Sequence, residues 1–178
     1  TYEKFRNHFD IPTHKSVVIK NGIDKIGKAP PYQKGQPIRI IHQNTPWRGL
    51  SVLLGAMQLV KNPLISLDVY SSCEVYGKDF YDQNDQCMAA GLYCITTNYG
   101  ALFETGAEFP MYIPYENNKK LLAQKFAYGI DAAAESLHRE EIHNHLECQS
   151  AYAQAYYGWN KIGTSWKRFL EGAVNAKK

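Results

Sequence analysis

The sequence lacks the features that mark a membrane-spanning or secreted protein. Its apolar runs are interrupted by Lys, Asn or Asp well before the roughly 20 residues that cross a bilayer, and no basic stretch followed by an apolar block is found at its start. The four cysteines form neither a CxxC pair nor a regular framework. We therefore expect a cytoplasmic protein with reduced cysteines and no transmembrane segment.

Concentrated charge of one sign is also missing. The net charge is +3, from 20 Lys and Arg against 17 Asp and Glu. Residues 1–50 hold nine basic and three acidic side chains, whereas residues 51–150 hold six and thirteen. No clustered basic footprint of a duplex-binding protein results, so no nucleic-acid partner is expected. A few cations in one cleft would instead suit a phosphate-bearing small ligand.

The common catalytic and metal-binding patterns do not occur. The glycines form neither GxGxxG nor a P-loop, and no spacing supports a Ser/His/Asp or Cys/His arrangement. Among the histidines near the C-terminus only His138 and His145 share a helical face, and no carboxylate or thiol completes a ligand set. The sequence therefore predicts no metal and no cofactor, and it identifies no catalytic residue.

What is present is the pattern of one α/β domain. With 178 residues, 44% of them hydrophobic, the chain is long enough for one well-cored domain. Helix patterns occupy residues 2–9, 50–60, 118–145 and about 158 onward, and strand patterns occupy residues 16–20, 38–42, 64–70, 93–97 and 110–113. This order predicts a parallel sheet with helices on both faces and a helical C-terminal extension. The chain then divides into an N-terminal helix, strand and connection, a core, and C-terminal helices, at residues 1–37, 38–117 and 118–178.

The first candidate binding segment, residues 45–49, lies between a predicted strand and a predicted helix. Such corners hold ligands in open parallel sheets, because free backbone N–H groups favour anions there. Arg48 would contact phosphate oxygens, and Gly49 would let the backbone approach closely. The same residues also suit a solvated helix start and an ordinary turn, and the local pattern leaves both interpretations open.

The second candidate segment, residues 96–104, has the same strand, turn and helix order. It contains Asn98, Tyr99 and Gly100 in the turn and Glu104 in the following helix. Glu104 suits a sugar hydroxyl or a cation, and equally the compensation of a helix dipole. Because both corners follow strands of a parallel sheet, we expect them to open on one cleft.

Three segments carry recognisable motifs: VVIKNGID at residues 17–24, TPWRGL within residues 41–57, and CMAAG followed by ITTNYGALFE within residues 87–104. In this order they resemble the donor domain of glycosyltransferase group 1 enzymes, a retaining family with two Rossmann-like domains in the GT-B architecture. The resemblance covers residues 16–106. It implies a chain that binds a nucleotide diphosphate sugar, beside an N-terminal acceptor-binding domain that is absent from this sequence.

The resemblance also assigns roles to single residues. Arg48 falls on a Lys that holds the donor diphosphate, Gln43 falls on an Arg and loses its charge, and Gln86 falls on a Glu that binds the ribose. The implied contacts to the donor diphosphate and sugar come from eight residues: Gln43, Thr45, Arg48, Gly49, Asn98, Tyr99, Gly100 and Glu104.

The sequence departs from the family between the third predicted strand and residue 87. Family members carry further strand and helix units there, and one βαβ unit takes about 30 residues or more. Either the sheet is abbreviated, or a stretch between Tyr76 and Gln86 is omitted; the polar run at residues 81–86 favours omission.

Two alternatives to a transferase remain: a noncatalytic nucleotide-sugar or protein-binding module on the same half-fold, and a flavodoxin-like receiver or nucleotide-binding domain.

Overall fold

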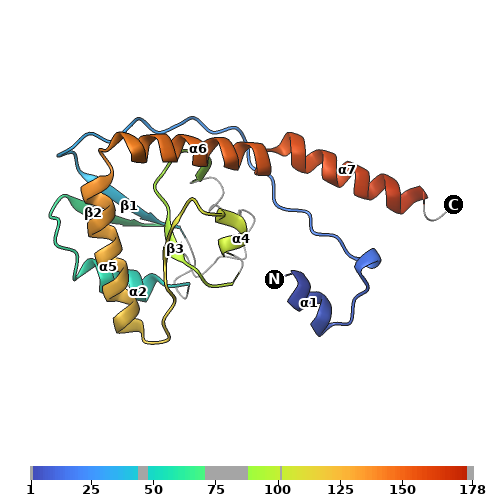
Figure 1. Cartoon of the computed structure of the whole chain (residues 1–178), viewed down its shortest axis with the longest axis horizontal. Coiled ribbons are helices and arrows are strands. Elements are labelled where there is room, and N and C mark those ends of the chain that lie inside the picture. Colours follow the sequence, from blue (N-terminus) through green and yellow to red (C-terminus); the bar gives the residue numbers. More distant parts are fainter. Residues whose placement is uncertain (1, 44–47, 71–87, 101, 176–178) are drawn as a thin grey trace.

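The computed structural model describes residues 2–43, 48–70, 88–100 and 102–175. Within these ranges the chain has an α/β fold, in which short parallel strands are accompanied by helices (Figure 1). Four strands are described: β1 (Ile38–His42), β2 (Ile65–Val69), β3 (Ile95–Thr97) and β4 (Met111–Ile113). The coarse prediction of an α/β fold is therefore confirmed.

The strands form two sheets in place of the single sheet that the sequence predicts. β1 pairs with β2 in parallel, with Ile38 opposite Ile65, and β3 pairs with β4 in parallel, with Ile95 opposite Met111. Among the described residues no ladder joins one pair to the other. Side chains of β1 alternate between half-buried and exposed, as expected for a strand with one covered face.

The N-terminal segment lies outside both sheets. It begins with α1 (Tyr2–His8) and a 3₁₀ turn, η1 (Thr13–Lys15). The predicted strand at residues 16–20 is wrong, because this segment forms no strand and pairs with no described strand. Its β-branched residues favour a strand only where a neighbour supplies backbone partners. The first pairing comes later, as an isolated bridge between Ile23 and Gly158.

α2 (Leu50–Met57) and α5 (Lys119–Ser136) pack against each other through alanines. Ala56, Ala123 and Ala127 form one buried cluster, which lets the two helices approach closely. α5 also packs on β4, where a Cβ added to Gly129 would lie 2.8 Å from Ile113 Cδ1. α5 therefore contacts elements associated with both sheets.

Hydrogen bonds fix the start of α5 and its contact with the chain after α2. The predicted cap at Asn118 is confirmed, since its side chain accepts hydrogen bonds from the amides of Lys120 and Leu121. The carboxylate of Asp131 accepts from the backbone amides of Lys61 and Asn62 at 3.1–3.3 Å.

The predicted single helix at residues 118–145 is wrong, because α5 ends at Ser136 and α6 (Glu140–Tyr157) begins after a break. Arg139 is extended, with ψ of 142°, and turns the chain. The break allows α6 to pack on a different segment from α5. Ser150 Oγ donates to the Ala89 carbonyl at 2.6 Å, and the buried Gln149 amide donates to the Leu92 carbonyl at 2.8 Å.

α7 (Trp159–Asn175) continues from α6 and is anchored at its first turn. The Trp159 amide donates to the Ile23 carbonyl at 3.3 Å, and Ile162 is buried. Residues 164–175 are exposed, and in Figure 1 this part of α7 projects away from the sheets toward the C-terminus. Of the described helices, none combines the length and the apolar character needed to cross a membrane.

Candidate functional site

The first candidate corner follows β1. Gln43 is exposed directly after the strand, and Thr45 lies outside the described residues. Arg48 and Gly49 are exposed at the start of α2. Gly49 is the N-cap residue with φ of 95°, and among the described residues no side chain caps the helix there. The first turn of α2 therefore presents backbone N–H groups without a side-chain acceptor, which is favourable for an anion.

The conformation of Gly49 also keeps this corner open. A positive φ of this size is strained for residues with a Cβ, and glycine adopts it freely. A Cβ built at Gly49 would meet no atom of the described residues within 4 Å. The glycine therefore shapes the turn and leaves space in front of it.

The second candidate corner follows β3 and has the same feature. Gly100 has φ of 68°, and a Cβ built there would also meet nothing within 4 Å in the part of the chain that the structure describes. Asn98 connects this corner to β4: its amide donates to the Ile113 carbonyl at 3.3 Å, and its Oδ1 accepts from the Tyr115 amide at 3.0 Å. The side-chain oxygen of Asn98 is thus used within the protein, and its NH₂ group has no hydrogen bond to the described residues.

Tyr99 is stacked on Tyr115. The ring centroids are 4.5 Å apart with an interplanar angle of 31°, and the residues are 63% and 44% exposed. An exposed aromatic pair thus stands next to the Gly100 turn. The resemblance to the family did not indicate Tyr115, and its 16-residue separation from Tyr99 leaves no local sequence signal.

Glu104 lies exposed on the short helix α4 (Leu102–Gly106), which is held in place from two directions. The Tyr112 hydroxyl of β4 donates to the Ala107 carbonyl at 2.7 Å, and the Tyr157 hydroxyl of α6 donates to the Thr105 carbonyl at 2.7 Å. Gly106 permits this arrangement, since a Cβ there would lie 2.6 Å from the Tyr112 hydroxyl.

His42, the last residue of β1, was not indicated as a site residue by the sequence. Its Nε2 is buried and has no hydrogen-bond partner in the described part of the chain. Burial lowers the pKa of His42 below its ordinary value of 6.5, which favours the neutral ring at neutral pH. The available sequence signal was its position, a titratable residue at the carboxyl end of a strand.

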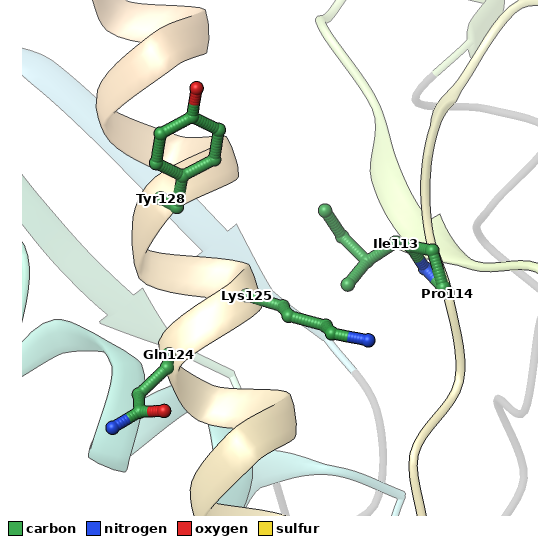
Figure 2. A pocket seen from close by; sticks show the side chains of 5 residues that line it. All are labelled: Ile113, Pro114, Gln124, Lys125 and Tyr128. Carbon is green, nitrogen blue, oxygen red and sulfur yellow. The ribbon is translucent and has the colours of Figure 1, made fainter.

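An open pocket of about 390 Å³ lies between β4 and α5 and is lined by Ile113, Pro114, Gln124, Lys125 and Tyr128 (Figure 2). In Figure 2 the Lys125 side chain extends from α5 toward Ile113 and Pro114. Its ammonium group pairs with Glu116 at 2.5 Å. Of the predicted site residues that the structure describes, none lines this pocket, so the pocket and the two corners are different places.

No described group of three or more His, Cys, Asp or Glu side chains is placed to hold a metal ion. His145 Nε2 lies 2.9 Å from the Phe109 carbonyl oxygen, an acceptor, so this nitrogen carries the proton. Gln86, predicted to bind the ribose, lies outside the described residues.

The structure places the predicted residues in two groups. Gln43, Arg48 and Gly49 lie at the first corner, and Asn98, Tyr99, Gly100 and Glu104 lie at the second. In the described part of the chain no hydrogen bond or ring contact joins the two groups. A comparison with known proteins found no family model and no curated protein that matches this chain.

Proposed function

We propose that this chain is the donor-binding domain of a retaining glycosyltransferase, and that it binds the diphosphate and sugar of a nucleotide diphosphate sugar. The observation that carries the proposal is the pair of open glycine turns. Gly49 and Gly100 both have positive φ, both follow a strand of a parallel pair, and both precede a helix. Such turns are typical of α/β domains that bind phosphates.

The proposed chemistry is electrostatic. Cleavage of the bond between sugar and diphosphate places negative charge on the leaving group, and fixed donors lower the barrier by stabilising that charge. Arg48 supplies a guanidinium group at the first corner, and the uncapped amides of α2 supply N–H donors beside it. The turn at Gly100 and the carboxylate of Glu104 hold sugar hydroxyls at the second corner.

The proposal includes two further partners. The acceptor substrate binds an N-terminal domain that this sequence does not contain, and activity requires that domain. Gln86 accepts a hydrogen bond from the ribose of the donor. Protein cations and amides neutralise the diphosphate in this scheme, so it includes no metal ion.

A noncatalytic binding module is the second candidate, and specific observations favour it. Gln43 is uncharged where the resemblance places an arginine, so one diphosphate contact is weaker. At the second corner, the Asn98 oxygen and the Tyr99 ring already interact with Tyr115. A half-fold with these features would bind a nucleotide sugar without turning it over.

Turnover by the chain together with its acceptor-binding domain distinguishes the two candidates. The assay follows release of nucleoside diphosphate from UDP-, GDP- and ADP-sugars, and NMR reports the anomeric configuration of the product. We expect release with retention, strongly reduced by Arg48→Ala and unchanged by Arg168→Ala, an exposed arginine on α7. Donor binding without release would favour the module, and an inverted product would contradict the retaining mechanism.

A further inference from the structure

The outer part of α7 carries an apolar face that no described segment covers. Four large side chains recur at helical spacing on one side, and their exposed fractions are 44% for Trp166, 45% for Phe169, 55% for Leu170 and 61% for Val174. Every residue in the range 164–175 is exposed. Four neighbouring apolar side chains in water are unusual for the surface of a soluble domain.

The other side of α7 is basic. It carries Lys161, Lys167 and Arg168, whereas Glu171 is the single acidic residue in α7 and lies 3.9 Å from Lys167 as an exposed ion pair. A strongly amphipathic helix of low overall hydrophobicity, with Trp, Phe and Leu on one face and Lys and Arg on the other, is typical of helices that lie in a membrane interface. Tryptophan suits that boundary, since its ring is apolar and its N–H is polar.

The charge distribution of the whole chain indicates the sign of the partner surface. Residues 151–178 hold five basic side chains and one acidic side chain, and residues 1–50 hold nine and three. The N-terminal part also carries exposed aromatic rings on and just after α1, Phe5 at 56% and Phe9 at 58%. Residues 51–150, by contrast, hold six basic and thirteen acidic side chains. Both terminal segments are therefore basic and both carry exposed aromatic residues, and a basic segment complements an anionic surface.

We propose that α7 binds the surface of a bilayer that contains anionic lipids. The apolar face, formed by Trp166, Phe169, Leu170 and Val174, enters the boundary between headgroups and acyl chains, and the basic side chains remain at the headgroup level. The helix lies on the membrane and does not cross it, in agreement with its amphipathic pattern. This proposal stands independently of sugar transfer, because it uses none of the residues at the two corners.

Co-sedimentation of the full chain with vesicles tests the proposal. We use vesicles of phosphatidylglycerol and phosphatidylcholine in equal parts, and vesicles of phosphatidylcholine alone. The chain is expected to bind the anionic vesicles. The double variant Trp166→Ser/Phe169→Ser is expected to bind them at least about tenfold more weakly. Tyr128→Ser is the matched control, because Tyr128 is 79% exposed on α5, and it should bind like the unaltered chain.

A charge variant separates the electrostatic contribution from the apolar one. Arg168→Gln should weaken binding to the anionic vesicles by about fivefold, since each basic side chain near such a surface contributes on the order of 1 kcal/mol. It should leave binding to phosphatidylcholine unchanged. Because the replaced side chains are exposed, circular dichroism should show the same helix content in all variants.

Three results would overturn the proposal. The first is no binding of the unaltered chain to anionic vesicles, and the second is equal binding of the Trp166→Ser/Phe169→Ser variant. The third is a dimer, or a complex with a protein domain, that dissociates in the double variant while vesicle binding does not change. That third result would assign the apolar face to a protein partner.

Discussion

Asn98 Oδ1 accepts a hydrogen bond of 3.0 Å from the Tyr115 amide, and so ties the turn after β3 to the chain that leaves β4. The two residues are 17 positions apart in the sequence, and their contact brings the Tyr99 and Tyr115 rings together. A predicted ligand residue therefore also shapes the corner in which it lies.

We expect Asn98→Ala to lower the free energy of unfolding by about 1 kcal/mol, because the Tyr115 amide loses its acceptor while remaining partly hydrated. Asn98→Asp keeps an oxygen at the same position and should cost less. Urea unfolding of both variants measures the difference. Equal losses for the two variants would show that the hydrogen bond is not the cause.

Asp131 should contribute more to the free energy of unfolding than Asn98 does, because its charged carboxylate accepts hydrogen bonds from the amides of Lys61 and Asn62 at 3.1–3.3 Å. Asp131→Ala is expected to cost about 1.5–3 kcal/mol of unfolding free energy, the range for hydrogen bonds to a charged group. Asp131→Asn retains an oxygen acceptor and should lose roughly half of that. If chemical denaturation gave the same midpoint for Asp131→Ala and the unaltered chain, this contact between α5 and the segment after α2 would be unimportant.

Two glycine substitutions should shift stability in opposite directions. In Gly106→Ala the new Cβ would lie 2.6 Å from the Tyr112 hydroxyl and 2.7 Å from Pro110 Cγ, so we expect a loss of about 1–3 kcal/mol. In Gly172→Ala the Cβ meets nothing within 4 Å on an exposed helix, and higher helix propensity should add up to about 1 kcal/mol. Thermal unfolding compares them, and a neutral Gly106→Ala would contradict the close packing of α4 on β4.

The pH dependence of stability should include a contribution from His42. Burial lowers the pKa of His42 in the folded state, so below about pH 6.5 the unfolded state binds more protons than the folded state. The stability that the neutral His42 ring contributes is therefore present above about pH 6.5 and is lost as the pH falls below that value. His42→Asn should therefore lose less unfolding free energy than the unaltered chain between about pH 7.5 and pH 5. Parallel curves for the two proteins would show that His42 does not titrate differently on folding.

The sequence predicted the elements that depend on local chemistry. A β-branched run predicted β1, and Asn118 predicted the start of α5 because its side chain caps the helix without help from distant residues. The prediction of a strand at residues 16–20 was wrong, because strand formation also depends on a neighbouring strand that supplies backbone hydrogen-bond partners. No glycine or proline lies near the break at Arg139, and the apolar spacing continues through it. The sequence therefore does not indicate that one helix ends there and another begins.

At the two candidate corners the local backbone geometry was predictable, and the long-range contacts were not. The order of strand, turn and helix predicted a turn at Gly49 and at Gly100, and both residues have the positive φ that favours glycine. The contacts that hold the second corner join residues far apart in the sequence, such as Tyr157 and Thr105 at a separation of 52. Periodicity and composition carry no information on such pairs, because they follow from how α6 packs on the domain.

Calorimetric titration with UDP, GDP and ADP tests the central claim most directly, since it measures whether the first corner binds a nucleoside diphosphate. We expect at least one of the three to bind the unaltered chain, and its dissociation constant to rise about tenfold in Arg48→Ala, as for the loss of a charge-assisted contact of roughly 1.4 kcal/mol. Arg168→Ala should bind like the unaltered chain. Absence of binding by all three diphosphates, or an unchanged constant in Arg48→Ala, would contradict the account.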